Sequence, residues 1–444
     1  MSESKPHKSF DDSEASQRAF FVLWTGQALS LLGSQAVQFA LIWWLTLETG
    51  SAAMLATATL LGLLPQAVLG PVIGVLVDRW NRKRILFWAD ASVALASVTL
   101  AGLFAFGVAS TGHVLALLLV RAMGAAFHGP AMLASTSLMV REDLLAKIQG
   151  LNQGLQGGLL ILSAPLGAFL VSWVPMAGVM VVDVATAAFA LIPLIFIRVP
   201  QPASNLSPGS KESNGQGAVR SLLAEMAAGF SYLRERGGHL ALLGLATMIN
   251  LCMVPAFSLL PLLVQERGGD AGLLGWMTAL FGVGMLVGGT VLATWGGFQR
   301  RMLTSMTFLL GLGLATLALS AAPAGNSAAS LAAIFAVGFM VPLVNGPIQA
   351  VLQATVAPEF QGRVFTLYGS LATLAAPLGL LLAAPIADFA GITSWYLAGG
   401  VTCLVMGCIG LGLPMILQLE DSQLEDSQLE EGSDESSLAE SAPF

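Results

Sequence analysis

Charged residues, cysteines and histidines are scarce in this sequence. Only 10% of the 444 residues are Asp, Glu, Lys or Arg, against 55% hydrophobic residues, and the mean hydropathy is +0.78. Water-soluble domains carry roughly 25% charged residues, so this composition excludes an ordinary soluble protein. We expect the chain to lie in a membrane.

The scarcity of reactive residues also excludes several kinds of site. Cys252, Cys403 and Cys408 all lie in apolar runs, where a thiol is a small packing group rather than a metal ligand or half of a disulfide. No stretch has the form G-x-x-x-x-G-K-S/T, so ATP hydrolysis by this chain is not expected. The run GVGMLVGG (282–289) lies inside an expected helix and indicates close helix packing instead of nucleotide binding. We expect no enzymatic activity, no bound metal and no cofactor.

The apolar runs are long enough to cross a bilayer. Crossing about 30 Å of hydrocarbon takes about 20 helical residues, and runs of this length without strict alternation are helices rather than barrel strands. The sequence therefore predicts an all-α polytopic membrane protein. Its twelve expected spans lie near residues 20–47, 53–77, 85–108, 113–138, 149–174, 176–198, 240–264, 272–295, 302–322, 327–352, 364–388 and 392–417.

The distribution of basic residues predicts the orientation of these spans. With a cytoplasmic N-terminus, all 19 Lys and Arg residues fall on the cytoplasmic side except Arg121, which lies within a span, and Arg267, which lies outside. Basic segments resist translocation during insertion. We therefore expect a multi-pass protein of the cytoplasmic membrane with both termini in the cytoplasm.

The polar segments divide the chain into five expected parts. Residues 1–17 form a cytoplasmic N-terminal segment, 18–199 a six-helix bundle, and 200–238 a cytoplasmic linker with an amphipathic helix. Residues 239–417 form a second six-helix bundle, and 418–444 an acidic tail that holds nine acids and no base and is expected to be disordered.

The two bundles show a weak internal repeat. A shift of 217 residues lays FHGPAMLASTSLMVRED (127–143) on VNGPIQAVLQATVAPEF (344–360), and the same shift carries Lys83 and Arg84 onto Arg300 and Arg301. One offset that aligns two distant regions predicts two six-helix halves inserted in the same orientation.

The loop between the second and third spans, GVLVDRWNRKR (74–84), resembles the motif G-x-x-x-D-R-x-G-R-R/K of the major facilitator superfamily. The residues that match it are Gly74, Asp78, Arg79, Arg82 and Lys83. Asn81 replaces the usual glycine, a mild departure because asparagine tolerates the left-handed backbone better than most residues do. The resemblance implies twelve helices in two halves.

Two further segments resemble motifs of the same superfamily. RAMGAAF (121–127) resembles its helix 4 motif, with Arg121 as the buried base. SAPLGA (163–168) resembles its antiporter Gly-Pro motif through Pro165 and Gly167, although Ala164 stands in place of glycine and the spacing is one residue short. The antiporter motif is therefore matched only in part.

Two longer segments, FHGPAMLASTSLMVREDLLAKIQGLNQ (127–153) and NGPIQAVLQATVAPEFQGRVFTL (345–367), resemble the drug-efflux branch that includes macrolide exporters. That resemblance implies export of an apolar or amphipathic compound, driven by an inward proton gradient.

Two interpretations of the loop motif stay open. In the first, Asp78 caps or pairs near the cytoplasmic helix ends, and Arg79 and Arg82 make charge-assisted contacts that close the cytoplasmic side. In the second, the cluster only fixes the topology.

Three charged residues lie at lipid depth, where charges are costly and default to functional candidates. Arg121 and Asp183 each lie on the order of 10 Å from the external end of a span, at 1.5 Å per residue, so the two can pair. Either Asp183 takes up a proton and frees Arg121 to change partners, or the two form a permanent structural ion pair. Asp90 is the second candidate for proton coupling, unless it reaches toward the interface or the basic loop.

Polar residues recur on one face of several spans, at the three-, four- and seven-residue spacings of a helix. In the resembled fold, helices 1, 4, 7 and 10 line the central cavity, and hydrogen bonding between packed helices is the alternative. The candidate substrate-binding residues are Gln27, Ser34, Gln38, His128, Asn250, Asn345 and Gln349.

These patterns favour a secondary active transporter that exports apolar or amphipathic small molecules. The expected partners are a small-molecule substrate, a proton as counter-ion and the lipid bilayer, with no nucleic acid and a monomeric chain. An exporter of an endogenous metabolite such as a siderophore, or an uptake permease, is one alternative. A membrane sensor or scaffold that signals through the acidic tail is another.

Overall fold

The computed structural model consists of helices joined by short turns and contains no strand in the described residues, which are 10–140, 142–197, 230–231, 233–234, 237–356 and 358–419. At some positions inside these helices only the backbone is described. Residues 1–9 of the N-terminal segment, most of the expected linker helix and nearly all of the acidic tail lie outside the described residues.

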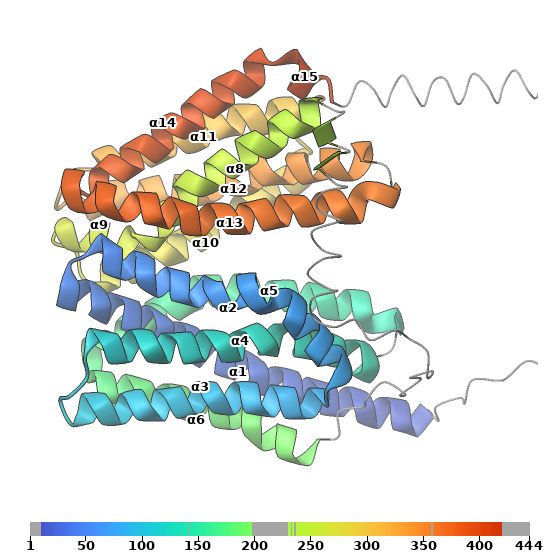
Figure 1. Cartoon of the computed structure of the whole chain (residues 1–444), viewed down its shortest axis with the longest axis vertical. Helices are drawn as coiled ribbons and strands as arrows, with labels where there is room; N and C mark the ends of the chain where they lie inside the picture. The colour runs from blue at the N-terminus through green and yellow to red at the C-terminus, as the bar shows by residue number, and fades with distance from the viewer. Residues whose placement is uncertain are drawn as a thin grey trace, which may run out of the picture. The chain divides into compact units, whose positions relative to one another are not determined.

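The helices of the first half run in chain order from blue to green in Figure 1. They are α1 (Phe10–Thr49), α2 (Ala52–Arg79), α3 (Arg82–Ala105), α4 (Thr111–Met139), α5 (Glu142–Trp173) and α6 (Met176–Phe196).

The helices of the second half follow from yellow-green to red in the same figure. They are α8 (Gly237–Ser258), α9 (Leu260–Glu266), α10 (Ala271–Trp295), α11 (Arg301–Ala321), α12 (Ser327–Thr355), α13 (Pro358–Ala390), α14 (Ile392–Gly412) and α15 (Pro414–Leu417).

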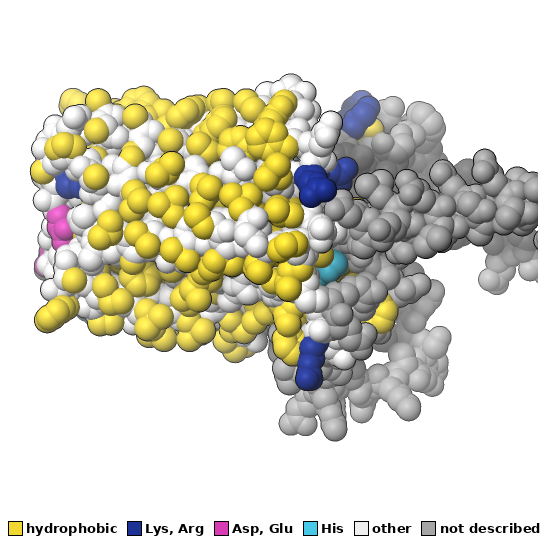
Figure 2. Space-filling view, turned by 90° about the horizontal axis from the view of Figure 1, so that it is seen from above, with side chains coloured by type: hydrophobic (Ala, Val, Ile, Leu, Met, Phe, Trp, Pro, Cys, Tyr) yellow, Lys and Arg dark blue, Asp and Glu magenta, His cyan; other side chains and the backbone are white. Residues whose placement is uncertain are grey.

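Twelve of the described helices are long and apolar enough to span a membrane. Each of them coincides with one of the twelve spans predicted from the sequence, which confirms the predicted number and order. On the face visible in Figure 2, hydrophobic side chains cover the length of the helices and charged ones lie near their ends. Such a surface suits lipid along its sides and water at its ends.

Short polar residues fix where several helices begin. The side-chain oxygens of Ser51, Asn81, Ser110 and Asn326 each accept a hydrogen bond from the backbone N–H three residues later, at the starts of α2, α3, α4 and α12. Such N-caps satisfy donors that have no partner within the helix.

Asn81 does not adopt the left-handed backbone that asparagine tolerates. Asn81 has φ −66° and ψ 111°, an extended conformation, and its amide oxygen accepts from the N–H of Arg84 at 3.2 Å. Asparagine serves here as an N-cap, because its short side chain reaches the first turn of α3. Glycine has no side chain that could make this bond.

Two predicted spans were too long at their ends. The expected span 240–264 is split at Leu259 into α8 and α9, and 392–417 is split at Leu413 into α14 and α15. Each short helix carries a proline in its first turn, Pro261 in α9 and Pro414 in α15. Proline lacks the N–H of the helical ladder and clashes with the preceding turn, so an apolar run continues while its helix does not.

The helices group into two compact units. One contains residues 1–220 together with 258–279, and the other contains 221–257 together with 280–444. In the first unit, α1 packs against α5 and α6, and α4 packs against both α2 and α3. A Cβ at Gly26 of α1 would collide with the backbone of α6, so glycine allows this close approach.

In the second unit, α11 packs against α12 and α14. Glycines again bring backbones together, because a Cβ at Gly284 or Gly288 of α10 would collide with the backbone of α12. The predicted role of GVGMLVGG in close helix packing is therefore confirmed.

Candidate functional site

The first unit encloses four polar residues that include a buried ion pair. We call this set the arginine cluster; its members are Ser34, Ser97, Arg121 and Asp183. Arg121 of α4 is 6% exposed and Asp183 of α6 is fully buried, and the two form an ion pair. The pairing predicted from their similar depths is therefore confirmed. Its role in proton coupling stays a prediction.

Two serines complete the shell of the Asp183 carboxylate. Oδ1 accepts a hydrogen bond from Ser34 Oγ of α1 at 2.8 Å, and Oδ2 accepts from Ser97 Oγ of α3 at 2.6 Å. Arg121 also donates to the backbone carbonyl of Ser34 at 3.2 Å. One carboxylate therefore connects helices α1, α3, α4 and α6, so its charge state bears on the packing of all four.

A second set of three residues, which we call the histidine cluster, consists of Gln27, Asp90 and His128. The Gln27 amide of α1 donates to Asp90 Oδ2 of α3 at 2.7 Å, and its carbonyl oxygen lies 2.8 Å from His128 Nε2 of α4. His128 Nε2 lies 3.6 Å from Asp90 Oδ1. Because the Gln27 nitrogen faces the carboxylate, its oxygen faces the ring, and His128 Nε2 is the donor in this arrangement.

The two clusters share one helical register. Gln27 and Ser34 on α1, Asp90 and Ser97 on α3, and Arg121 and His128 on α4 are each seven residues apart. Seven residues are about two helical turns, or roughly 10 Å along the axis, and return to nearly the same face. Each of these three helices therefore contributes one residue to the arginine cluster and one to the histidine cluster.

The basic loop motif is anchored to the ends of neighbouring helices. Arg82 is 9% exposed and donates from Nη1 to the carbonyl of Ala134 in α4 at 2.7 Å. Lys83 donates to the carbonyl of Ile195 at 3.0 Å, in the last turn of α6, where carbonyls lack helical partners. Both bonds hold the start of α3 against the rest of the first unit.

Three other motif residues are described only by their backbone. Gly74, Asp78 and Arg79 lie in the last turns of α2, and the side chains of Asp78 and Arg79 are not among those described. The predicted gating contacts of Asp78 and Arg79 therefore stay predictions.

The partial antiporter motif lies in the middle of α5. Gly167 is buried, and a Cβ there would collide with the carbonyl of Ala36 and the ring of Phe39 on α1. Pro165 lies inside the same helix. This segment is thus a close packing point between α5 and α1.

The other four substrate-binding candidates, Gln38, Asn250, Asn345 and Gln349, do not belong to either cluster. Gln38 is half-buried on α1, and Asn250 donates to the carbonyl of Ala246 in its own helix at 2.9 Å. Asn345 and Gln349 are exposed on α12. By contrast, Gln27, Ser34 and His128 are bonded within the clusters.

Sequence reasoning missed the histidine cluster and the part played by Ser97. It treated Gln27 and His128 as lining residues and Asp90 as a separate charge. The repeated seven-residue spacing on three helices was the available signal, because it places the polar members of α1, α3 and α4 at two common levels.

Comparison with known proteins identifies the family. The family model described as Major Facilitator Superfamily matches residues 23–380 and, in a second match, 240–441. The chain belongs to the major facilitator superfamily. It is a transporter of twelve spans in two six-helix halves, and its relatives are transporters rather than enzymes.

Two curated relatives place this superfamily member in the drug-efflux branch, as the sequence motifs predicted. It is 35% identical over 403 residues to macrolide efflux protein A of Streptococcus pyogenes, covering 90% of this chain and 96% of that protein. It is 28% identical over 424 residues to the multidrug efflux pump Tap of Mycobacterium tuberculosis, covering 90% and 94%.

A solved structure shares the fold of this superfamily member. The bacterial homologue of the human lysosomal transporter Spinster, in its inward-facing and unoccupied conformation, superposes with a TM-score of 0.65 at 16% identity, over 95% of this chain and 99% of that one. At this identity the similarity concerns the fold alone.

Proposed function

We propose that this transporter exports apolar or amphipathic, macrolide-like molecules across the cytoplasmic membrane by alternating access and proton antiport. The proposal rests chiefly on the arginine cluster, in which a fully buried carboxylate and a guanidinium join four helices. A relative named for macrolide efflux aligns over 90% of this chain. The chain would act as a monomer with both termini in the cytoplasm.

Asp183 is the group that we assign to carry the proton. In this conformation Asp183 is closed off from water, so proton uptake requires a conformation that hydrates the cluster. Neutralising Asp183 removes the counter-charge of Arg121, which keeps its bond to the Ser34 carbonyl. Arg121 is then free to take another acceptor, and the bonds that connect α4 to α1, α3 and α6 change with it.

The histidine cluster offers a second titrating site about two turns along the same helices. Asp90 and His128 face each other across 3.6 Å, and Gln27 bridges them. A proton that enters this site changes the charge of a carboxylate or an imidazole, and either change alters the bonds of Gln27. We assign this cluster to proton transfer at the other end of the path.

Substrate contacts then fall to other residues. Gln27, Ser34 and His128 are engaged with carboxylates, so a ligand that bound them would break cluster bonds. We therefore assign ligand contact to Gln38 in the first unit and to Asn250, Asn345 and Gln349 in the second. Amides of this kind suit a largely apolar ligand with scattered hydrogen-bonding groups.

The basic loop supports the gating part of the proposal. Arg82 and Lys83 hold the start of α3 to α4 and α6. A loop fixed in this way can transmit movements of α4 and α6 to Asp78 and Arg79, to which we assign closure of the cytoplasmic side.

Drug accumulation in cells that lack other pumps tests the proposal. Cells that express the wild type should accumulate less macrolide, and a protonophore should abolish the difference. Asp183→Asn should accumulate as much macrolide as cells without the protein, at equal membrane expression. Full exclusion by Asp183→Asn would contradict our assignment of the proton carrier.

Asp270→Asn is the matched control for the same chemical change. Asp270 is exposed at the start of α10, where its side chain caps the N–H of Leu273 at 2.8 Å. Asparagine caps a helix about as well as aspartate. This variant should therefore retain wild-type efflux, and a loss equal to that of Asp183→Asn would indicate a general effect of lost acidic charge.

A further inference from the structure

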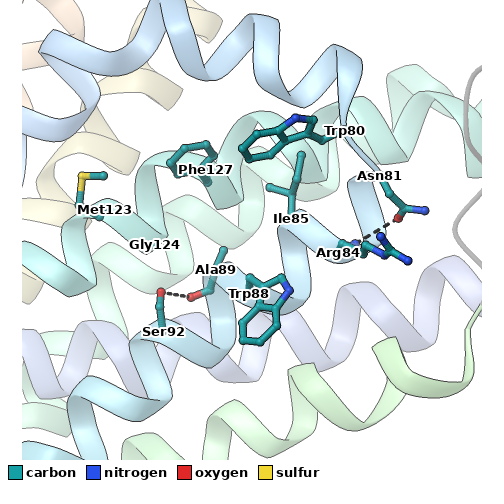
Figure 3. A pocket seen from close by; sticks show the side chains of 10 residues that line it. All are labelled: Trp80, Asn81, Arg84, Ile85, Trp88, Ala89, Ser92, Met123, Gly124 and Phe127. Carbon is teal, nitrogen blue, oxygen red and sulfur yellow. Dashed lines mark hydrogen bonds between the residues drawn. The ribbon is translucent and has the colours of Figure 1, made fainter.

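A groove lies beside the start of α3, apart from both clusters. Its volume is about 650 Å³, and its walls come from the end of α2, the first turns of α3 and the middle of α4. The lining residues, shown in Figure 3, are Trp80, Asn81, Arg84, Ile85, Trp88, Ala89, Ser92, Met123, Gly124 and Phe127. Pockets of this size hold molecules the size of a drug or a lipid segment.

The groove has a polar end and an apolar end. Trp80, Asn81 and Arg84 gather at one end, while Met123 and Phe127 lie farther along in Figure 3. No carboxylate is among the described side chains that line it. This arrangement suits an amphiphile whose polar part is an anion.

The three consecutive basic residues at the start of α3 have different environments. Arg82 binds the carbonyl of Ala134 and Lys83 binds that of Ile195. Arg84 is exposed and contributes to the wall of the groove. Within the described part of the chain, its guanidinium makes no hydrogen bond or ion pair, so it is available to an anionic group.

The groove lies where a membrane helix meets water. The candidate span of α3 begins at Arg82, and Trp80 and Trp88 on either side of Arg84 are 56% and 69% exposed. Exposed tryptophans are typical of the interface between headgroups and acyl chains, and the side rich in Lys and Arg is the cytoplasmic one. An occupant of this groove therefore comes from the cytoplasmic leaflet.

We propose that this groove binds one anionic phospholipid. Arg84 and Asn81 hold the phosphate, and an acyl chain lies against Trp88, Phe127 and Met123. The observations favour a lipid over a cationic amphiphile, because the only charged group described in the wall is a base. Basic pockets between membrane helices on the cytoplasmic side bind anionic headgroups in the same way.

Quenching of tryptophan fluorescence by brominated lipids tests this site without any transport assay. The full-length protein is reconstituted in phosphatidylcholine with a minor fraction of phosphatidylglycerol, and the same small fraction of total lipid is brominated in each case, as either phosphatidylcholine or phosphatidylglycerol. Brominated phosphatidylglycerol should quench more strongly, and Trp88→Phe should remove most of the difference. Arg84→Gln should weaken phosphatidylglycerol binding about fivefold, the effect expected of one base at a membrane surface.

Two further variants separate this site from a general charge effect. Ser92→Phe fills the groove without changing charge and should also remove the preference for phosphatidylglycerol. Arg301→Gln removes the base that the internal repeat aligns with Arg84, and it should leave the preference intact. Equal quenching by both lipids in the wild type, or an equal loss in Arg301→Gln, would overturn the proposal. Displacement of phosphatidylglycerol by a macrolide in this groove would show a drug site instead of a lipid site.

Discussion

The two compact units bury different kinds of polar group. In the described part of the first unit, the buried charged residues are Arg82, Asp90, Arg121 and Asp183. In the described part of the second unit, the buried polar residues are His239, Thr304, Ser305, Thr316, Ser320 and Ser330. The described part of the second unit therefore buries hydroxyls and one imidazole, whereas that of the first also buries carboxylates and guanidinium groups.

This difference matters because hydroxyl bonds do not respond to protons over the physiological range. Thr316 donates to the carbonyl of Leu312 in its own helix at 2.8 Å, and Ser305 donates to the carbonyl of Val344 in α12 at 2.9 Å. A carboxylate that joins four helices differs, because protonation would remove its charge and with it the ion pair to Arg121. Our proposal therefore assigns proton coupling to the first half of the chain.

The largest effect is expected when one member of the buried ion pair is removed. Asp183→Leu leaves Arg121 buried without its counter-charge and should lower the free energy of unfolding by about 3–5 kcal/mol. The double variant Asp183→Leu with Arg121→Met should recover most of that stability but no coupled transport. Unfolding in detergent and efflux in cells measure the two quantities separately.

Thr316→Val is the matched change in the second unit. It removes a buried hydroxyl that bonds its own helix and should alter stability by less than about 1 kcal/mol. A loss as large as that of Asp183→Leu would erase the contrast between the units.

Glycine packing should come next in size. Gly288→Ala places a Cβ against the backbone of Phe339 in α12 and should destabilise the protein by about 1–3 kcal/mol. Gly62→Ala in α2, where no atom lies within 4 Å of the added Cβ, should instead stabilise it by about 0.5–1 kcal/mol. Thermal unfolding of both variants checks the signs, and equal signs would contradict the packing role.

A smaller structural effect is expected at Asp90. Asparagine can still accept from Gln27, so Asp90→Asn should remain within about 1 kcal/mol of wild-type stability. It cannot titrate, so the pH profile of efflux should change even though Asp183 is intact. Efflux measured over a pH series tests this, and an unchanged pH profile would remove the histidine cluster from the proton path.

The smallest effects concern the cap of α3. Asn81→Ala removes the bond to the N–H of Arg84 and should cost about 1 kcal/mol, whereas Asn81→Gly should cost only a few tenths. Unfolding curves of both variants decide between a cap and a left-handed position. A gain in stability from Asn81→Gly would favour the left-handed position.

The sequence was sufficient for the fold because a membrane span is a local property. Twenty apolar residues form a helix in lipid whatever surrounds them, so the number and order of spans were predictable. The ends of two spans were not predictable, because a helix break just before Pro261 and another just before Pro414 fall inside continuous apolar runs. Hydropathy does not register a missing N–H, although the prolines themselves were visible.

The candidate site was predictable only in part. Arg121 and Asp183 could be paired from depth alone, because two opposite charges at one level of a bilayer have few other partners. The association of Asp90 with Gln27 and His128 depends on which faces of α1, α3 and α4 meet. That information lies in helix packing, which one sequence does not specify.

The most direct test of the account is proton-driven drug transport by Asp183→Asn in proteoliposomes. In wild-type vesicles, an imposed proton gradient should drive macrolide movement against its concentration gradient, with protons moving the opposite way. In Asp183→Asn vesicles the account predicts only downhill drug exchange, without proton movement. Uphill transport at the wild-type rate in that variant would contradict the assignment of coupling to the arginine cluster.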